Sequence, residues 1–127
     1  MKILLDTSFI LSCIKQKIDF ISETDRVVDD KVEFIIPEEV VSELKIISVR
    51  KGEKRENKTA ALLALKILEK NNFESVKLNS LHADKGIVNY INSSANEFVL
   101  ATLDSNLKRR VKGRILTIKG KNSLGIV

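Results

Sequence analysis

Five short apolar runs, separated by segments whose apolar residues have helical spacing, are the feature that most limits how this chain can fold. The predicted strands are residues 2–5, 32–36, 73–78, 97–101 and 115–118. The predicted helices are residues 7–14, a short helix within 18–28, and residues 37–49, 59–70, 84–92 and 105–111. Strands that alternate with helices predict a parallel sheet with helices on both faces, joined by right-handed crossovers. We therefore expect one compact three-layer α/β/α domain spanning residues 1–127.

The length of 127 residues is enough for a core that needs neither disulfides nor a structural metal. The single cysteine, Cys13, falls on the apolar stripe of the first helix, which favours a core position over catalysis. Met1 leads straight into an apolar strand without secretion-signal features, and no apolar run approaches the roughly 20 residues that cross a membrane. We therefore expect a cytoplasmic protein with no membrane partner.

The net charge of +5 favours a polyanionic partner over an uncharged one, although a merely soluble basic protein is an alternative. Two basic clusters carry much of this charge. They are Arg50, Lys51, Lys54, Arg55 and Lys58, and Lys108, Arg109, Arg110, Lys112 and Arg114. Residues 50–58 contain no apolar residue and are predicted as a loop or a frayed helix end. A solvated surface is the alternative reading of both clusters. Aromatic residues make up 5% of the chain, so nucleic-acid binding would depend on phosphate charge more than on stacking.

Four acidic residues have positions that the others do not share. Asp6, Asp84 and Asp104 follow strand-like runs, and Glu43 lies at the flank of the apolar stripe of its helix. The carboxyl ends of parallel strands meet at one edge of the sheet, where ligands bind. Carboxylates gathered there repel one another unless a cation neutralises them, and hard oxygen ligands select Mg²⁺ or Mn²⁺. A cation of this kind activates water for phosphodiester hydrolysis.

Each acid also has a simpler interpretation. The three aspartates precede helical segments, where Asp is a preferred N-cap or first-turn residue. A neighbouring Lys or Arg could pair with Glu43, or the acids next to it could be the solvated ones. Ser8 and Thr102 lie near two of the aspartates and could hydrogen-bond a carboxylate or a metal-bound water, or only the local backbone. His82 is predicted to lie in an exposed loop.

Several segments, in chain order, resemble the PIN-domain ribonucleases, most closely the branch of the small-subunit rRNA-processing endonuclease. They are DTSFI at residues 6–10, IK and KID at 14–15 and 17–19, IPE at 36–38, VSEL at 41–44, ADK at 83–85 and ATLDSNLKRR at 101–110. The last segment is the most specific. The resemblance implies a five-stranded parallel sheet of order 3-2-1-4-5 and an acidic pocket that binds Mg²⁺ or Mn²⁺ and cuts RNA.

The family's metal-site acids correspond to Asp6, Glu43, Asp84 and Asp104, with Ser8, Thr102 and Asn106 as supporting residues. Lys85 and Asn106 stand where relatives often carry further acids, which argues against a second metal. The predicted RNA-binding residues are Arg50, Lys51, Lys54, Arg55, Lys108, Arg109, Arg110 and Lys112.

The resemblance predicts an rRNA-processing endoribonuclease. One alternative is a VapC-like toxin ribonuclease paired with an antitoxin, and another is a catalytically weak RNA-binding module in ribosome assembly. An antitoxin or ribosome-assembly partner and a homodimer are the protein partners that these alternatives imply.

Overall fold

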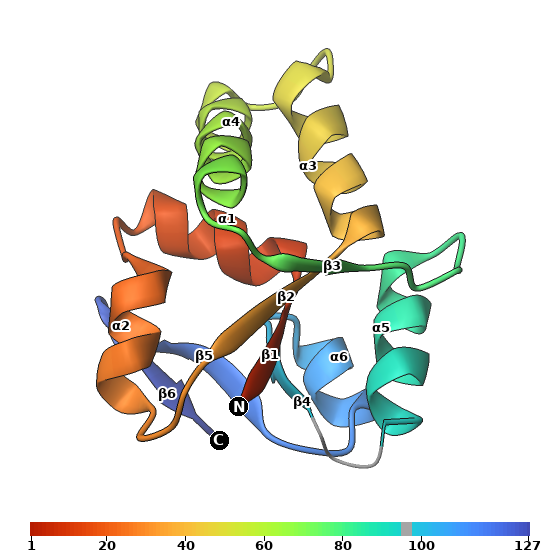
Figure 1. The fold of residues 1–127 in the computed structure, drawn as a ribbon. Helices are drawn as coiled ribbons and strands as arrows, with labels where there is room; N and C mark the ends of the chain where they lie inside the picture. Colours follow the sequence, from red (N-terminus) through yellow and green to blue (C-terminus); the bar gives the residue numbers. More distant parts are fainter. Residues whose placement is uncertain (95–97) are drawn as a thin grey trace.

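The structure is a computed structural model that describes residues 1–94 and 98–127. These residues form six strands and six helices (Figure 1). Two helices follow each of the first two strands, and the last two strands are consecutive. The strands are β1 (Lys2–Leu5), β2 (Glu33–Pro37), β3 (Glu74–Val76), β4 (Phe98–Ala101), β5 (Ile115–Lys119) and β6 (Ser123–Ile126). The helices are α1 (Thr7–Lys15), α2 (Phe20–Val27), α3 (Glu38–Val49), α4 (Arg55–Lys70), α5 (Ala83–Asn92) and α6 (Ser105–Arg110). Residue 97, the first residue of the predicted fourth strand, lies outside the described part.

The strands form a single sheet of order β3-β2-β1-β4-β5-β6. The first five strands are parallel and confirm the predicted order 3-2-1-4-5, while β6 pairs antiparallel with β5. The predicted five-stranded parallel sheet is thus confirmed, and β6 extends it by one strand that was not predicted. The hairpin turns at Gly120, whose φ of 70° lies in the left-handed region that glycine adopts without strain.

Side chains that alternate along the strands divide the core between the two faces of the sheet. Ile3 and Leu5 point to the face that α1, α2, α3 and α4 cover. Leu4 points to the opposite face, where α5 and α6 pack through Ile87 and Leu107. This alternation follows from the two-residue period of a strand, and it confirms the predicted three-layer arrangement. Cys13 is fully buried in the core on the same face as Ile3 and Leu5.

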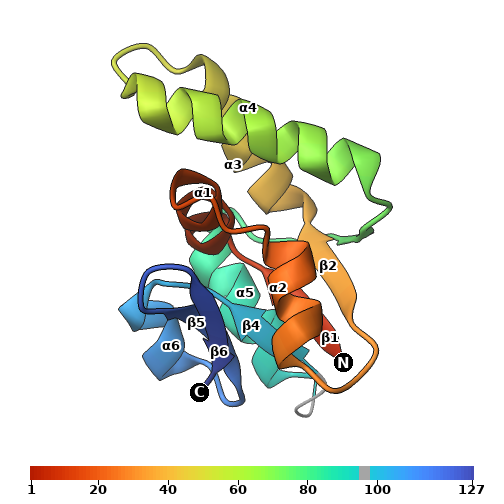
Figure 2. The same ribbon diagram turned by 90° about the vertical axis from the view of Figure 1, so that its left-hand side faces the viewer.

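Helices α3 and α4 form an antiparallel pair that stands out from the body of the domain (Figures 1 and 2). The α4 helix begins at Arg55, so the prediction that residues 50–58 are all loop or frayed end was wrong for its second half. The first turn of α4 contains no apolar residue, so it adds no side chain to the hydrophobic core.

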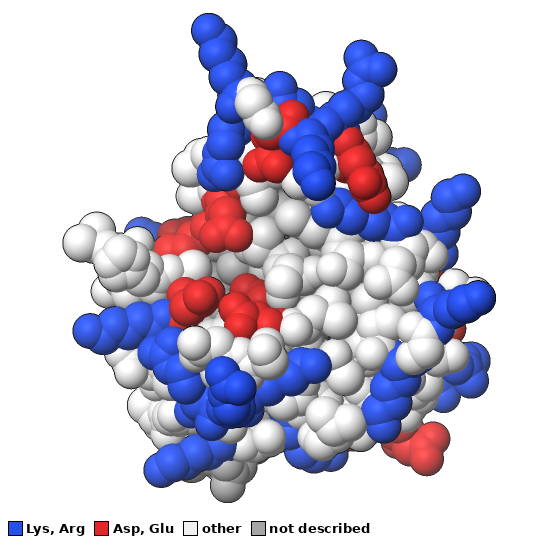
Figure 3. Space-filling view, turned by 180° about the vertical axis from the view of Figure 1, so that it is seen from behind, with Lys and Arg blue, Asp and Glu red and all other residues white. Residues whose placement is uncertain are grey.

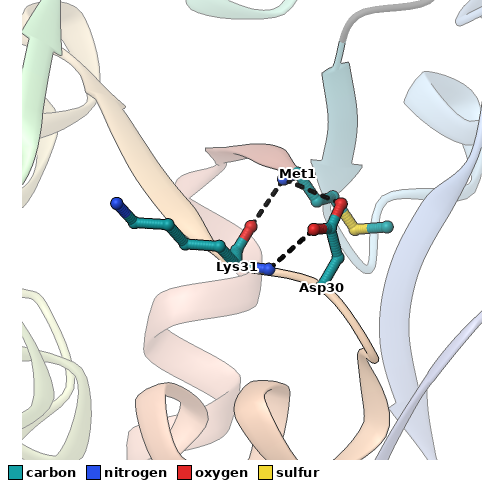
Figure 4. Close-up of polar contacts among 3 residues, drawn as sticks. All are labelled: Met1, Asp30 and Lys31. Atoms are coloured by element: carbon teal, nitrogen blue, oxygen red, sulfur yellow. Dashed lines mark hydrogen bonds and ion pairs between the residues drawn. The ribbon is translucent and has the colours of Figure 1, made fainter.

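The first residues of the chain are fixed to the segment that leads into β2 (Figure 4). The amino group of Met1 lies 3.4 Å from Oδ2 of Asp30 and donates to the backbone carbonyl of Lys31. The backbone N–H of Lys31 donates to Oδ1 of Asp30 at 2.8 Å, and this bond is the main reason that the pKa of Asp30 lies below its ordinary value. These contacts hold β1 and β2 in register at the edge opposite the candidate site. Among the described residues, no helix is both long and apolar enough to span a membrane.

Candidate active site

The candidate site begins where two neighbouring strands end. In the β1–β4 register Leu5 pairs with Ala101, and the backbone N–H of Asp6 donates to the carbonyl of Ala101 at 3.1 Å. Asp6 and Thr102 therefore leave the sheet side by side. In the sheet, β2 lies on one side of β1 and β4 on the other. The strand order therefore reverses between β1 and β4, where Asp6 and Thr102 lie. Parallel α/β sheets bind their ligands at such a point.

Asp6 is a buried carboxylate, 5% exposed, that accepts two hydroxyl hydrogen bonds on one oxygen. Ser8 Oγ donates to its Oδ2 at 2.7 Å, and Thr102 Oγ1 donates to the same oxygen at 2.8 Å. Although Asp6 occupies the N-cap position of α1, its side chain makes no capping bond. Burial raises the pKa of Asp6 above its ordinary value, the hydroxyls oppose this rise, and the charge of Asp84 adds to it.

The same two hydroxyls connect Asp6 to the segment that carries Asp104. Thr102 Oγ1 accepts the backbone N–H of Asp104 at 3.1 Å, and Ser8 Oγ accepts the backbone N–H of Leu103 at 3.2 Å. The two hydroxyl oxygens lie 3.2 Å apart. Both hydroxyls thus bond to a carboxylate, as one reading of the sequence predicted. The alternative of a local backbone bond describes Thr102 only, because the backbone partner of Ser8 lies 95 residues away.

Asp104 caps α6, as the simpler interpretation of the sequence predicted. Its Oδ1 accepts the backbone N–H groups of Asn106 at 2.8 Å and Leu107 at 3.3 Å. Its Oδ2 accepts no hydrogen bond from the described residues, and the side chain is partly exposed. One oxygen of Asp104 is therefore structural, and the other is available to a ligand. The side chain of Asn106, two residues further on, is exposed.

Asp84 and Glu43 reach the region from other elements. Asp84 lies in the first turn of α5, is exposed, and is near enough to raise the pKa of Asp6. Glu43 is half-buried on α3 and lines an open cavity of about 490 Å³ that also contacts Ala83, the residue before Asp84. Within the described ranges, the side-chain carboxylate of Glu43 makes no hydrogen bond or ion pair. The Lys or Arg that could have paired with it is thus not found there.

The acids next to Glu43 differ from one another. Glu38 is exposed. Glu39 accepts the backbone N–H groups of Leu78 and Asn79, each at 3.1 Å. Burial alone would raise the pKa of Glu39, but these hydrogen bonds outweigh it and the pKa lies below its ordinary value. Glu39 is therefore a structural residue rather than a solvated one. The spacing of the sequence could not reveal this, because its partners are backbone groups 39 and 40 residues away.

A divalent cation would find only oxygen donors here. Across residues 1–94 and 98–127, no three His, Cys, Asp or Glu side chains are grouped so that together they could hold a metal ion. Mg²⁺ commonly binds one or two carboxylates and completes its shell with water and substrate phosphate. Such a hydrated Mg²⁺ or Mn²⁺ ion needs no more than one or two carboxylates, and the buried Asp6 and the free oxygen of Asp104, joined through Thr102, can supply them. His82 is exposed, as predicted, and burial raises the pKa of the Cys13 thiol to about 12, which leaves it inert.

Basic side chains lie on both sides of the acidic region. Figure 3 shows acidic side chains gathered on this face, with Lys and Arg side chains above and below them. Of the upper cluster, Arg50, Lys51, Lys54 and Arg55 are exposed, and Arg50 contacts Glu53 at 3.4 Å. Of the lower cluster, Arg109, Arg110 and Lys112 are exposed. Lys108 is half-buried and its ammonium donates to Thr117 Oγ1 at 3.1 Å, so it is less available than its neighbours.

Comparison with known proteins identifies the fold independently. A family model described as a PIN like domain matches residues 3–120. Ribonuclease VapC4 of Methanocaldococcus jannaschii is 32% identical over 110 residues, which cover 87% of this chain and 82% of that protein. The structure of the PIN domain endonuclease Utp24 superposes with a TM-score of 0.80 and 24% identity, covering 98% of this chain and 90% of that one. A domain of a functionally unknown M. jannaschii protein superposes with a TM-score of 0.58 and 18% identity, covering 95% and 94%.

Proposed function

This chain belongs to the PIN-like domain family, and we propose that it is a Mg²⁺- or Mn²⁺-dependent endoribonuclease that hydrolyses RNA phosphodiester bonds. The observation that carries the proposal is the buried carboxylate of Asp6 at the strand-order switch, with two hydroxyls on one oxygen. Keeping a charged carboxylate in this position costs stability, because burial raises its pKa. A cation that neutralises it offsets this cost and gives the arrangement a function.

The side chains of the site have separable roles in this proposal. Asp6, Glu43, Asp84 and Asp104 would surround the cation, with at most two of them as direct ligands in the arrangement described. Ser8 and Thr102 orient the Asp6 carboxylate through its Oδ2. When bound, the cation lowers the pKa of a water molecule and stabilises charge on a phosphoryl oxygen. Asn106 is placed to contribute a neutral oxygen beside Asp104.

The two basic clusters bind the RNA strand. Arg109, Arg110 and Lys112 on one side, and Arg50, Lys51, Lys54 and Arg55 on the other, hold phosphates across the acidic region, with Lys108 as a weaker contributor. Lys and Arg that bind phosphates displace counterions, so this binding weakens steeply as salt rises. The basic clusters hold the strand on both sides of a negatively charged site, and a bound cation would lower the repulsion between that site and the phosphates.

Two physiological roles fit a nuclease of this kind. The motif at residues 101–110 favours rRNA processing with ribosome-assembly partners. The 32% identity to ribonuclease VapC4 favours a toxin ribonuclease that an antitoxin partner neutralises. A homodimer is compatible with either role. A gene that encodes a small DNA-binding protein beside this one would favour the second.

Cleavage of single-stranded RNA by the purified protein tests the proposal. We expect cutting with Mn²⁺, none with EDTA, and a loss of at least about 100-fold in rate for Asp104→Asn. Asparagine keeps the oxygen that caps α6, so this variant removes a charge without removing the cap. Asp25→Asn is the matched control, because Asp25 is an exposed residue of α2, and this variant should cut RNA at the wild-type rate.

Equal cutting by Asp104→Asn would show that the carboxylate mechanism is wrong. Tight, salt-dependent RNA binding without cleavage under any metal would instead support the RNA-binding module.

A further inference from the structure

We propose that the cavity between α3 and the residues Leu81 and Ala83 receives one unstacked nucleobase of the RNA strand and prefers guanine. The inference rests on the proposed function, since it names what the same site recognises. The cavity has a volume of about 490 Å³, within the range of small-ligand sites, and it adjoins the candidate active site through Glu43 and Ala83.

Two apolar side chains from different elements line this cavity. Leu81 is 99% exposed on the segment between β3 and α5, and Ile46 is 53% exposed on α3. A single exposed apolar residue needs no explanation, but here two of them border the same cavity. Enzymes that act on unstacked bases hold them between aromatic or apolar side chains. This chain has few aromatic residues, and Leu81 and Ile46 supply apolar surfaces in their place.

The segment that carries Leu81 is fixed, so the exposure of this leucine is a built feature. Glu39 of α3 accepts the backbone N–H groups of Leu78 and Asn79. On the other side the segment packs against Gly86 of α5. A Cβ at Gly86 would lie 2.9 Å from the Cβ atoms of both Leu78 and Ser80, closer than real contacts allow. The segment is therefore held to α3 and α5 at once, and Leu81 projects from it.

The charge of the cavity selects a base rather than a phosphate. Glu38, Glu39 and Glu43 line it against a single basic residue, Arg50, whose guanidinium lies 3.4 Å from Glu53. The lining is therefore negative on balance, and a phosphate would be repelled unless a metal cation intervened. The carboxylate of Glu39 is already occupied by backbone groups, and Glu43 belongs to the proposed metal site. Glu38 accepts no hydrogen bond from any other described residue, which leaves its carboxylate free to accept N–H groups of a base.

Guanine fits this acceptor best among the four RNA bases. Its N1–H and N2–H₂ groups are adjacent donors that match the two oxygens of one carboxylate. Adenine and cytosine each offer a single amino group, and the N3–H of uracil lies between two carbonyl oxygens that a carboxylate repels. Matched bidentate contacts of this kind discriminate strongly between bases.

Fluorescence anisotropy tests the inference by measuring the affinity of the protein for ten-nucleotide oligouridylates. Each oligonucleotide carries one central guanine, inosine, adenine or cytosine, and all-uridine RNA is the reference. The measurement is made in EDTA, so that cleavage does not interfere. We expect the guanine oligonucleotide to bind about tenfold more tightly than all-uridine RNA. Inosine, which lacks only the N2 amino group, should lose most of this preference.

Variants show whether this cavity is responsible. Leu81→Ala and Glu38→Gln should each reduce the guanine preference to about twofold or less. Leu62→Ala, at another exposed leucine on α4 that does not line the cavity, should keep it. Equal affinity of the wild type for all the oligonucleotides, undetectable binding, or a preference that survives Leu81→Ala would overturn the inference. Failure of the proposed function is seen separately, as absence of cleavage with Mn²⁺ whatever the base preference.

Discussion

Replacing Thr102 with valine removes one hydroxyl from the centre of the site while keeping nearly the same shape. Thr102 is fully buried, its Oγ1 donates to Asp6 Oδ2 at 2.8 Å, and it accepts the backbone N–H of Asp104 at 3.1 Å. The variant loses a hydrogen bond to a charged group, worth about 1.5–3 kcal/mol, and leaves a partly buried N–H without its acceptor, which costs about 1–3 kcal/mol. Ser8 Oγ, 3.2 Å away, can replace part of this. We therefore expect a net loss of about 3 kcal/mol.

Thermal unfolding followed by circular dichroism measures this loss. For a domain of this size about 3 kcal/mol corresponds to a fall in Tm of about 10 °C. Thr24→Val is the matched control, because Thr24 is also fully buried but its Oγ1 has no hydrogen-bond partner among the described residues. Removing that hydroxyl should leave the Tm unchanged or raise it by a few degrees. If the two variants lose the same stability, the hydroxyl network around Asp6 does not contribute what we infer.

Three further predictions concern single charged residues. Because the folded-state pKa of Asp6 is raised, wild-type stability should fall as pH rises from 3.8 through that higher pKa. Asp6→Asn should thus have a higher Tm than the wild type at pH 7 in EDTA, and the difference between the two proteins should disappear near pH 3. A Tm of Asp6→Asn below that of the wild type at pH 7 would contradict this. Glu39→Gln should cost about 1 kcal/mol at neutral pH in urea unfolding, because it weakens the bonds to residues 78 and 79. The folded-state pKa of Glu39 is lowered, so this cost should vanish as pH falls through it; a cost that persists in acid would refute the charge argument. Arg109→Gln should reduce the slope of log affinity for single-stranded RNA against log salt by about 0.7, whereas Arg26→Gln, paired with Glu23 on α2, should leave it unchanged.

The sequence predicts four of the five parallel strands well, because each of these four is a local apolar run. β1, β2, β4 and β5 are buried on both faces, so nearly every residue in them is apolar. β6 was missed for the opposite reason. Its four residues, Ser123–Ile126, include a glycine and only two apolar side chains, and it is ordered by pairing with β5 rather than by its own composition. β3 was predicted too long, because it is an edge strand whose residues are largely exposed.

The start of α4 shows the same limit. Hydrophobic periodicity detects a helix only where apolar side chains mark its buried face, and the turn that begins at Arg55 has none. The helix was therefore predicted from Thr59, the point at which its apolar face begins. Charged residues that favour helices fill the missing turn, but their composition is equally typical of a solvated loop.

At the site, the sequence indicates which residues follow strands but not which of them meet. That Asp6 and Thr102 leave adjacent strands depends on β4 pairing with β1, a contact between segments 96 residues apart. The capping interpretation was correct for Asp104 and wrong for Asp6, and the two aspartates occupy equivalent positions in the sequence. The difference arises from Ser8 and Thr102, whose hydroxyls turn Asp6 away from the helix amides. The cavity beside Leu81 was not predicted, since its two walls are distant in sequence.

The central claim is that Asp6 and the acids near it bind a divalent cation. Titration of Mn²⁺ into the protein, followed by the electron paramagnetic resonance signal of the free ion, measures this binding directly. We expect the wild type and Asp25→Asn to bind Mn²⁺ equally well, and Asp6→Asn to bind it at least tenfold more weakly. Equal Mn²⁺ affinity in Asp6→Asn and the wild type would contradict the claim.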